Sequence, residues 1–485
     1  MAVTATTASI TEHSAGELAA AIRKGDVSSR DIVEAHIEVL QRAQLNALIA
    51  DRFEEARADA DAADVRAAAA REGDALDDLP LLHGVPCTVK ESISLKGMPN
   101  SAGLVARSEH RAETTAPSAQ RLLDAGVIPL GVTNVSELTM WIESDNRVYG
   151  RTHNAYDRKR IAGGSSGGEG AAVGSGGSPI GLGSDIAGSI RIPAFFNGVF
   201  GHKSSSNLVP NTDMFPSTHG EAGQMLAVGP LCRKAEDLMP VLRAIAGPDG
   251  QDEQVREVIL GDPADVEFAG LDVVISEHAS LLPVRRELRE ARERAAGALA
   301  AAGANVRRES MKSLRRALEL FLMSLQDGAG VTTREILAAE GADPVGWRSA
   351  FKRGGPHTPA TLLLLFSESV ASRMPDGRMR RLRAAAKSLR EEVEGVVGDG
   401  ILLHPPHARV APRHRTTIGQ SWLLTPTAVF NLVGLPATAV PMGLNARGLP
   451  LGVQVVAGYD RDHLSIATAI ELERVFGGWV PPSPA

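Results

Sequence analysis

The first 75 residues carry hydrophobic positions at helical spacing. Ser14 followed by Glu17 forms a capping-box pattern that marks a helix start, and Gly25 stands where that helix should end. A second amphipathic helix follows, and residues 51–71, rich in Ala, Asp, Glu and Arg, predict a long, largely solvated helix. We therefore expect an N-terminal segment of helices over residues 1–75.

Beyond this segment, short apolar runs alternate with helical patterns. The runs at 84–90 and 126–132 predict strands. Helical patterns dominate from about 237 to 397, within which 273–275 predicts an isolated strand. Strands that alternate with helices predict an α/β fold, in which a mixed, twisted sheet is covered by helices on both faces. The sequence therefore predicts one large domain over residues 76–485.

The composition is that of a folded, globular chain. Hydrophobic residues make up 43 % of the 485 positions and charged residues 22 %, which argues against a disordered or fibrous protein. The formal net charge of −7 argues against nucleic acid as a partner, because binding phosphates requires a basic face. The two cysteines, Cys87 and Cys232, are too few for a disulfide framework or a cysteine-built zinc site.

The sequence carries no pattern of membrane insertion or export. No stretch reaches the ~20 apolar residues that a transmembrane helix needs. Residues 1–16 lack the basic start and the apolar core of a secretory signal. We therefore expect no transmembrane segment and a cytoplasmic location.

Glycine is unusually frequent, with 49 residues in 485 against a usual share of ~7 %. Many of these glycines lie in two loops, residues 163–168 around Ser165 and residues 183–191 around Ser189. Loops this poor in side chains allow backbone N–H groups to approach a ligand. A short helix and a strand fit between the loops, and their lengths allow the chain to return and place Ser189 beside Ser165.

Two serines need a proton acceptor, and Lys90 is the candidate. It ends the apolar run 84–90, so it is either an ordinary surface lysine or a buried amine. Burial disfavours the charged form and lowers the pKa, which would make the amine a usable base near neutral pH. The residues alone leave both options open.

Together these segments resemble the amidase signature family. The resemblance rests on the glycine- and serine-rich core around Ser165 and Ser189, and on segments similar to the family's lysine segment (82–91) and C-terminal sheet region (431–436 and 448–454). Two further segments, 198–203 and 476–479, look most like the fatty acid amide hydrolase branch.

The resemblance implies a Ser-Ser-Lys site without histidine. Ser189 matches the nucleophile that becomes acylated, Ser165 the serine that bridges to the base, and Lys90 the base itself. The backbone N–H groups that match an oxyanion hole belong to Ile186, Ala187, Gly188 and Ser189. The residues that match supporting positions are Ser166, Asp185 and Arg191.

Such a site implies hydrolysis of the C–N bond of a carboxylic amide, releasing an acid and an amine through an acyl-enzyme. The expected partners are a small-molecule amide and water. No metal or organic cofactor is expected, because dinucleotide, P-loop and zinc-ligand patterns are missing from the sequence. The oligomeric state stays open, with a homodimer as one option.

The substrate is expected to be an apolar acyl or aryl amide, with esters and carbamates still open. Apolar helices at 317–325 and 361–366 favour a pocket shaped by the variable region of about 255–425. Ala187 stands where the family usually has Gly, and the membrane-anchoring helix of the animal fatty acid amide hydrolases has no counterpart in the sequence. These departures concern the substrate more than the chemistry.

Two other functions stay open. A glutamine-hydrolysing amidotransferase subunit would share the same core but would act on a small, polar substrate. Residues 163–167 also fit the nucleophile elbow of α/β-hydrolases, which would make Ser165 the nucleophile after a strand. That alternative requires a histidine base, for which the candidates are His404, His407, His414 and His463.

Overall fold

The computed structural model describes residues 10–483 except 219, 329–331, 343–354 and 372–375. In this part of the chain an 11-stranded mixed sheet forms the centre, with the strand order β1-β3-β2-β6-β8-β7-β12-β13-β11-β9-β10. Its strands are β1 (Leu48–Asp51), β2 (Pro86–Lys90), β3 (Ile128–Thr133), β6 (Ile180–Asp185), β7 (Phe200–Lys203), β8 (Ala227–Cys232), β9 (Asp272–Glu277), β10 (Asn305–Ser310), β11 (Ile401–His404), β12 (Ala437–Leu444) and β13 (Pro450–Ala457). A separate small sheet pairs β4 (Asp145–Asn146) with β5 (Gly150–Arg151).

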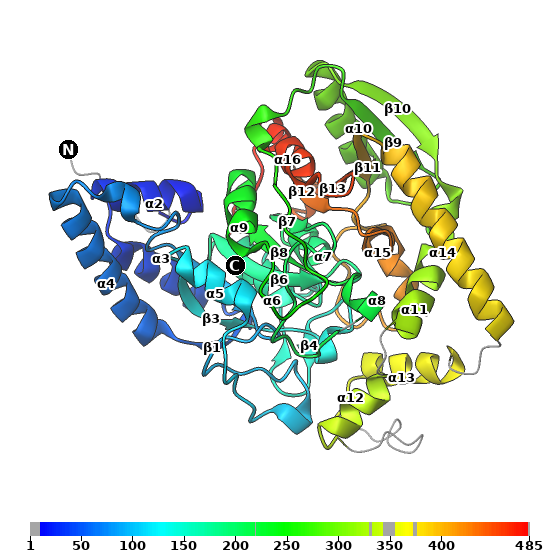
Figure 1. Ribbon diagram of the computed structural model, residues 1–485, viewed down its shortest axis with the longest axis horizontal. Helices are drawn as coiled ribbons and strands as arrows, with labels where there is room; N and C mark the ends of the chain where they lie inside the picture. Colours follow the sequence, from blue (N-terminus) through cyan, green and yellow to red (C-terminus); the bar gives the residue numbers. More distant parts are fainter. Residues whose placement is uncertain (1–9, 219, 329–331, 343–354, 372–375, 484–485) are drawn as a thin grey trace.

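Helices cover both faces of the large sheet, which confirms the predicted α/β architecture (Figure 1). One layer contains α9 (Leu238–Ile245), α10 (Arg286–Ala301) and α16 (Asp462–Phe476), with α2 (Ala15–Lys24), α3 (Ser29–Ala43), α4 (Phe53–Glu72) and α5 (Pro117–Asp124) beyond them. The other layer contains α6 (Gly167–Gly174), α7 (Arg191–Phe196), α8 (Gly220–Gly223), α11 (Ala317–Gly328), α14 (Asp376–Val397) and α15 (Thr425–Leu432). At the edge of the molecule, α12 (Thr333–Ala339) packs on α13 (Pro359–Ala371). None of the helices in the described residues is both long and apolar enough to span a bilayer.

The N-terminal helix α2 begins and ends where the sequence predicts. The Ser14 hydroxyl accepts a hydrogen bond from the Glu17 N–H at 3.0 Å, and the Glu17 carboxylate accepts one from the Ser14 N–H at 2.8 Å. Gly25 closes the helix with a φ of 79°, a conformation that glycine adopts without steric cost. The first 75 residues also contribute a strand that the sequence analysis missed, because β1 pairs with β3 at the edge of the sheet.

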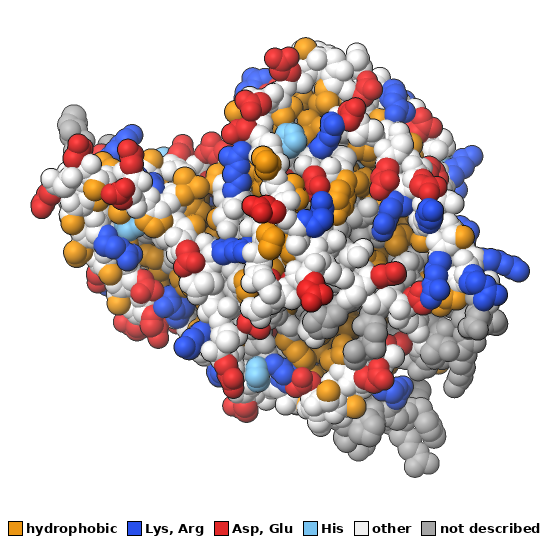
Figure 2. Space-filling model, in the orientation of Figure 1, with side chains coloured by type: hydrophobic (Ala, Val, Ile, Leu, Met, Phe, Trp, Pro, Cys, Tyr) orange, Lys and Arg blue, Asp and Glu red, His pale blue; other side chains and the backbone are white. Residues whose placement is uncertain are grey.

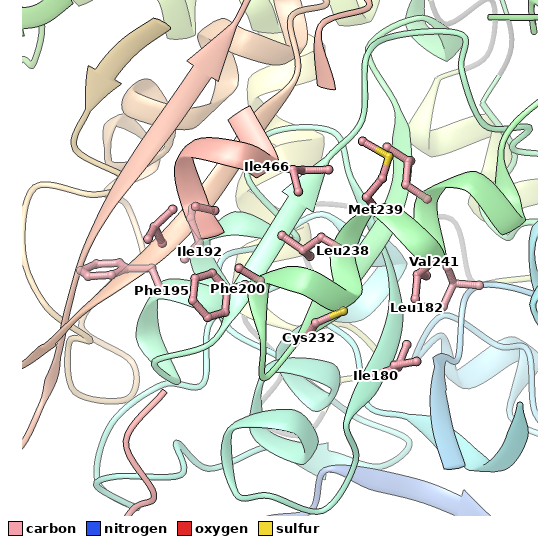
Figure 3. Close-up of a cluster of buried hydrophobic side chains, with 14 of the residues drawn as sticks. Ile180, Leu182, Ile192, Phe195, Phe200, Cys232, Leu238, Met239, Val241 and Ile466 are labelled. Carbon is pink, nitrogen blue, oxygen red and sulfur yellow. The ribbon is translucent and has the colours of Figure 1, made fainter. Parts of the chain in front are cut away.

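The strand predicted at 273–275 exists as β9, but it is not isolated. It pairs in parallel with β10 on one side and β11 on the other. Its side chains alternate between two hydrophobic clusters, with Val273 and Ile275 in one and Val274 in the other. The first cluster continues into the centre of the molecule, where Figure 3 shows that side chains of β6, β7, β8 and α9 belong to it.

The sheet brings the lysine segment and the second glycine-rich loop to the same end of its strands. β2 and β6 are parallel neighbours, with Val89 opposite Leu182. Their carboxyl ends, at Lys90 and Asp185, therefore lie at the same end of the sheet. In α/β proteins, ligand sites form at the carboxyl ends of the strands.

Candidate active site

Lys90 is the last residue of β2, and its side chain is fully buried. The amine donates hydrogen bonds to the hydroxyl of Ser165 at 2.7 Å, the hydroxyl of Ser184 at 2.9 Å and the carbonyl of Ser184 at 3.3 Å. Burial lowers the pKa of Lys90 to about 7, although nearby carboxyl groups act to raise it. The surface-lysine option is therefore excluded, and Ser184 is a contact that the sequence analysis missed.

Ser165 lies in a turn that is tightly enclosed by the segment 141–144. The peptide bond between Gly164 and Ser165 is cis. A Cβ atom at Gly164 would lie 2.4 Å from the carbonyl oxygen of Trp141, so a side chain does not fit there. The Ser144 hydroxyl donates to the Ser165 carbonyl at 3.1 Å and accepts from the N–H of Gly167, the first residue of α6, at 2.9 Å. The glycines of this loop thus serve close packing around the serine.

Ser189 lies in the second loop, next to the first. The backbone N–H of Ser166 donates to the carbonyl of Ser189 at 3.2 Å, and the Ser166 hydroxyl donates to the carbonyl of Ser184 at 3.2 Å. Ser189 is 8 % exposed, whereas Ser165 is 1 % exposed. Of the two predicted catalytic serines, Ser189 is therefore the one that is more accessible to a substrate.

The Asp185 carboxylate fixes the loop that carries Ser189. It accepts hydrogen bonds from the N–H groups of Gly188 at 2.7 Å and Ile190 at 3.1 Å. Of the four expected oxyanion donors, the Gly188 N–H thus already donates to Asp185 in this structure. The N–H groups of the other three expected donors, Ile186, Ala187 and Ser189, have no acceptor among the described residues.

The Arg191 guanidinium donates a hydrogen bond to each oxygen of the Asp185 carboxylate, at 3.0 and 2.9 Å. Burial by itself raises the pKa of Asp185, but the charge of Arg191 and its hydrogen bonds outweigh this and hold the pKa well below its usual range. Arg191 also donates to Asn431 at 2.6 Å and to Gln454 at 3.1 Å. Asp185 and Arg191 therefore form a buried ion pair, and further hydrogen bonds connect this pair to neighbouring side chains.

Asn431 and Thr427, both in α15, are functional candidates that the sequence analysis missed. The Asn431 amide donates to the carbonyl and the carboxylate of Asp185, at 2.8 and 3.0 Å. The Thr427 hydroxyl donates to the carbonyl of Ala187 at 2.6 Å. A Cβ atom at Gly188 would lie 2.3 Å from that hydroxyl, so this position requires glycine. Asn431 lies in a segment singled out for its resemblance, but sequence alone gave no sign of its contact with Asp185.

The histidines of the elbow alternative do not contact Ser165. His404 bonds to Ser276 at 2.7 Å, and His407 bonds to the carbonyl of Arg409 at 2.6 Å. Burial lowers the pKa of His404 to about 3 and that of His407 to about 4.

The two remaining histidines and the local fold also disfavour the elbow. His414 bonds to Glu143 at 2.7 Å, and His463 lies in α16. No described strand leads directly into Ser165, as an elbow would require. The Lys90 amine, 2.7 Å from the Ser165 hydroxyl, is therefore the candidate proton acceptor for Ser165.

Among the described residues, no group of three or more His, Cys, Asp or Glu side chains could hold a metal ion.

The apolar helix predicted at 317–325 is largely packed into the protein itself, whereas the one predicted at 361–366 is only partly buried. Leu318 and Phe321 of α11 belong to a buried cluster that also contains Phe430 of α15 and Ala187. Phe366 of α13 is 68 % exposed. Figure 2 shows further hydrophobic side chains in a hollow at the lower centre of the displayed face.

Comparison with known proteins shows the family to which the chain belongs. Residues 31–465 match the family model described as Amidase. The chain therefore belongs to the amidase signature family and is an amide hydrolase. It is 41 % identical to fatty-acid amide hydrolase 2-B of Danio rerio, over 97 % of this chain and 90 % of the relative. It is 38 % identical to fatty-acid amide hydrolase 2 of Homo sapiens, over 96 % and 89 %.

Solved structures show the same fold. The structure of 6-aminohexanoate cyclic dimer hydrolase complexed with substrate superimposes with a TM-score of 0.81, covering 96 % of this chain and 97 % of that one. The two sequences are 24 % identical, so the likeness concerns the fold alone.

Proposed function

We propose that the protein hydrolyses amides through an acyl-enzyme on Ser189, with Ser165 as proton relay and Lys90 as base. The observation that carries this proposal is the hydrogen bond of 2.7 Å from the buried Lys90 amine to the Ser165 hydroxyl. An amine whose pKa is about 7 is substantially neutral near neutral pH, and only the neutral form accepts a proton.

The proposed reaction begins when Ser189 Oγ bonds to the amide carbonyl carbon. Its proton passes to Ser165, whose own proton passes to Lys90. The negative charge that develops on the carbonyl oxygen is stabilised by free N–H groups of the nucleophile loop, from Ile186 and Ala187 among them. Collapse breaks the C–N bond, and the leaving nitrogen takes the proton back through the same route. Water then attacks the acyl-enzyme and releases the carboxylic acid.

We further propose an apolar acyl group as the preferred substrate part. Ala187, in the nucleophile loop, shares a hydrophobic cluster with α11 and α15. Relatives at 38–41 % identity over nearly the whole chain are named fatty-acid amide hydrolases. An apolar acyl chain gains free energy from leaving water, roughly in proportion to the area that it buries.

The decisive experiment is active-site labelling with a fluorophosphonate, followed by peptide mass spectrometry. We expect one label, on Ser189, and none on Ser189→Ala, which should keep the fold but lose turnover. Labelling on Ser165 instead would favour the elbow alternative. Turnover of glutamine but not of a simple aryl amide would favour the amidotransferase alternative.

A further inference from the structure

Glu137 is a buried carboxylate on the stretch of chain that leads to the enclosure of Ser165. It begins the short helical turn η3 (Glu137–Thr139). The segment 141–144, whose backbone packs against Gly164, follows soon after. The proposed proton relay does not use this carboxylate, so its contacts point to a different role.

Three donors at the start of α13 converge on the Glu137 carboxylate. One oxygen accepts a hydrogen bond from His357 Nδ1 at 2.6 Å. The other accepts from the Thr358 N–H at 2.6 Å and from the Thr361 hydroxyl at 2.9 Å. A negative charge at the start of a helix is also favoured by the helix dipole. Glu137 therefore fixes the first turn of α13 to η3.

His357 depends on this carboxylate for its orientation. The imidazole is buried, and its second ring nitrogen, Nε2, has no hydrogen-bond partner among the described residues. The bond to Glu137 is thus the polar contact that holds the ring in the described part of the chain. Loss of the carboxylate would leave a buried donor unpaired, which is unfavourable.

Hydrophobic contacts continue the attachment of these helices. Leu365 of α13 and Leu337 of α12 form a buried cluster with Leu138 and Leu104, and Met140 packs against this cluster. The pair of helices therefore packs on the stretch that connects η3 to the enclosure of the relay serine.

Two adjacent residues of this stretch have a left-handed backbone conformation. The φ angle is 53° at Leu138 and 58° at Thr139. Such angles are uncommon for bulky and β-branched residues, and they persist where surrounding contacts impose them. The N–H of Leu138 donates to the carbonyl of Ala102 at 2.8 Å, which is one such contact. The bonds of Glu137 to the start of α13 supply others.

A second polar contact holds α12. Arg107 donates to the carboxylate of Glu340, directly after α12, at 2.7 Å, and its guanidinium lies 3.8 Å from the centre of the Phe215 ring. Between the two helices, the N–H of Thr333 donates to Glu368 at 2.8 Å. The helices α12 and α13 are thus connected to each other and to the rest of the protein at two separate polar points.

The pair of helices also carries apolar surface that the protein leaves uncovered. The leucines at 362–364 are only partly buried, and Phe366 is exposed. Figure 1 draws α12 and α13 at the lower edge of the region in which Figure 2 shows hydrophobic side chains in a hollow. An apolar substrate group would gain free energy by covering such surface.

We propose that α12 and α13 form one wall of the acyl pocket and that Glu137 sets the position of this wall, which makes Glu137 a determinant of selectivity for long apolar acyl groups. This inference rests on the proposed function, in which the acyl part of the substrate is apolar. Glu137 is a positioning residue: it acts through His357, Thr358 and Thr361 and does not touch the reacting atoms.

The test is the dependence of kcat/KM on acyl chain length in Glu137→Ala, measured with a homologous series of amides. The change removes the acceptor of all three donors, so the wall should move and admit water. Wild type should gain about fourfold per CH₂, whereas a wall that leaves each methylene half exposed lowers the gain to about twofold. The loss should appear as a higher KM for long amides, while kcat changes much less.

A second variant keeps the test valid if Glu137→Ala fails to fold. In Thr361→Val, the side chain keeps its branched shape but loses the hydroxyl that donates to Glu137. The other two donors still hold the carboxylate. The gain per CH₂ should therefore fall in the same direction, but by less.

Glu143→Ala is the matched control, because Glu143 has similar partners with a different destination. This buried carboxylate accepts hydrogen bonds from His414 Nδ1 at 2.7 Å and from the N–H of Arg415 at 3.0 Å. Its partners belong to the loop between β11 and α15 and not to α13. Any loss of kcat/KM in Glu143→Ala should thus be equal for short and long amides.

A wild-type gain per CH₂ in the Glu137 and Thr361 variants that fold overturns the inference. An equal fall of the gain in Glu143→Ala overturns it as well, because the effect would then not be specific to the wall. Failure of the proposed function has another signature: wild type itself would show no dependence on chain length, and the inference would fall with it. If wild type prefers long chains and Glu137→Ala keeps that preference, the proposed function stands and the role of Glu137 is wrong.

Discussion

The amine of Lys90 lies 2.7 Å from the hydroxyl of Ser165, although 75 positions separate the two residues in the sequence. Lys90 reaches this place because it ends β2, whereas Ser165 lies in the turn before α6. Burial of the amine then lowers its pKa to about 7. Contact and burial together convert an ordinary lysine into a candidate base.

Replacement of Lys90 should separate a base from a mere positive charge. Lys90→Ala should reduce kcat/KM by ~10²–10⁴-fold, the usual contribution of general base catalysis. Lys90→Arg should be nearly as damaging, because guanidinium stays protonated.

The pH profile of kcat/KM provides the measurement for these variants. Because the neutral amine is active, the wild-type rate should rise with pH through a limb near the Lys90 pKa of about 7. If Lys90→Arg keeps both activity and limb, the lysine supplies charge only.

Asn431→Ala should weaken both the nucleophile loop and the fold. The change removes donors to Asp185 and leaves buried polar groups unpaired, at a cost of ~1–3 kcal/mol each. We expect a lower Tm together with a fall in kcat that exceeds the change in KM. Asn154→Ala is a control, since Asn154 is equally buried but bonds to the carbonyls of Ile161 and Phe196. An equal loss of kcat in both variants would contradict a specific role for Asn431.

The length of the acyl chain should govern kcat/KM. Each methylene that becomes buried contributes ~0.8 kcal/mol, so a homologous series of amides should gain about fourfold per CH₂ until the pocket is filled. Steady-state kinetics from acetamide upward provides the measurement. A flat series would contradict the apolar acyl proposal and favour a small, polar substrate.

Asp237 should make stability fall as pH rises. Burial raises its pKa from 3.8 to about 7, so between these values the folded state binds more protons than the unfolded state. The stability that it contributes is full below the lower value and is lost as pH rises through the higher one. Asp237→Asn removes this dependence, so its Tm relative to wild type should increase between about pH 4 and about pH 8. If the curves of Tm against pH for wild type and Asp237→Asn stay parallel, the raised pKa of Asp237 is contradicted.

The sequence by itself determined the local elements and the chemical residues. The capping box of Ser14 and Glu17 defined the start of α2, because both of its hydrogen bonds are local. The alternation of strands and helices gave the α/β class, since burying apolar faces leaves few arrangements. The two glycine-rich loops and Lys90 were identifiable because their resemblance to one family is dense.

Only the tertiary structure decided how these residues act. Whether Lys90 is buried, whether the Gly188 N–H is free, and which side chains brace Asp185 all depend on contacts between distant segments. Asn431 contacts Asp185 across 246 positions, and no local pattern encodes such a contact. The same holds for Glu169, whose buried carboxyl accepts hydrogen bonds from two threonines of separate strands. Burial and hydrogen-bond partners set these properties, and both exist only once the chain has packed.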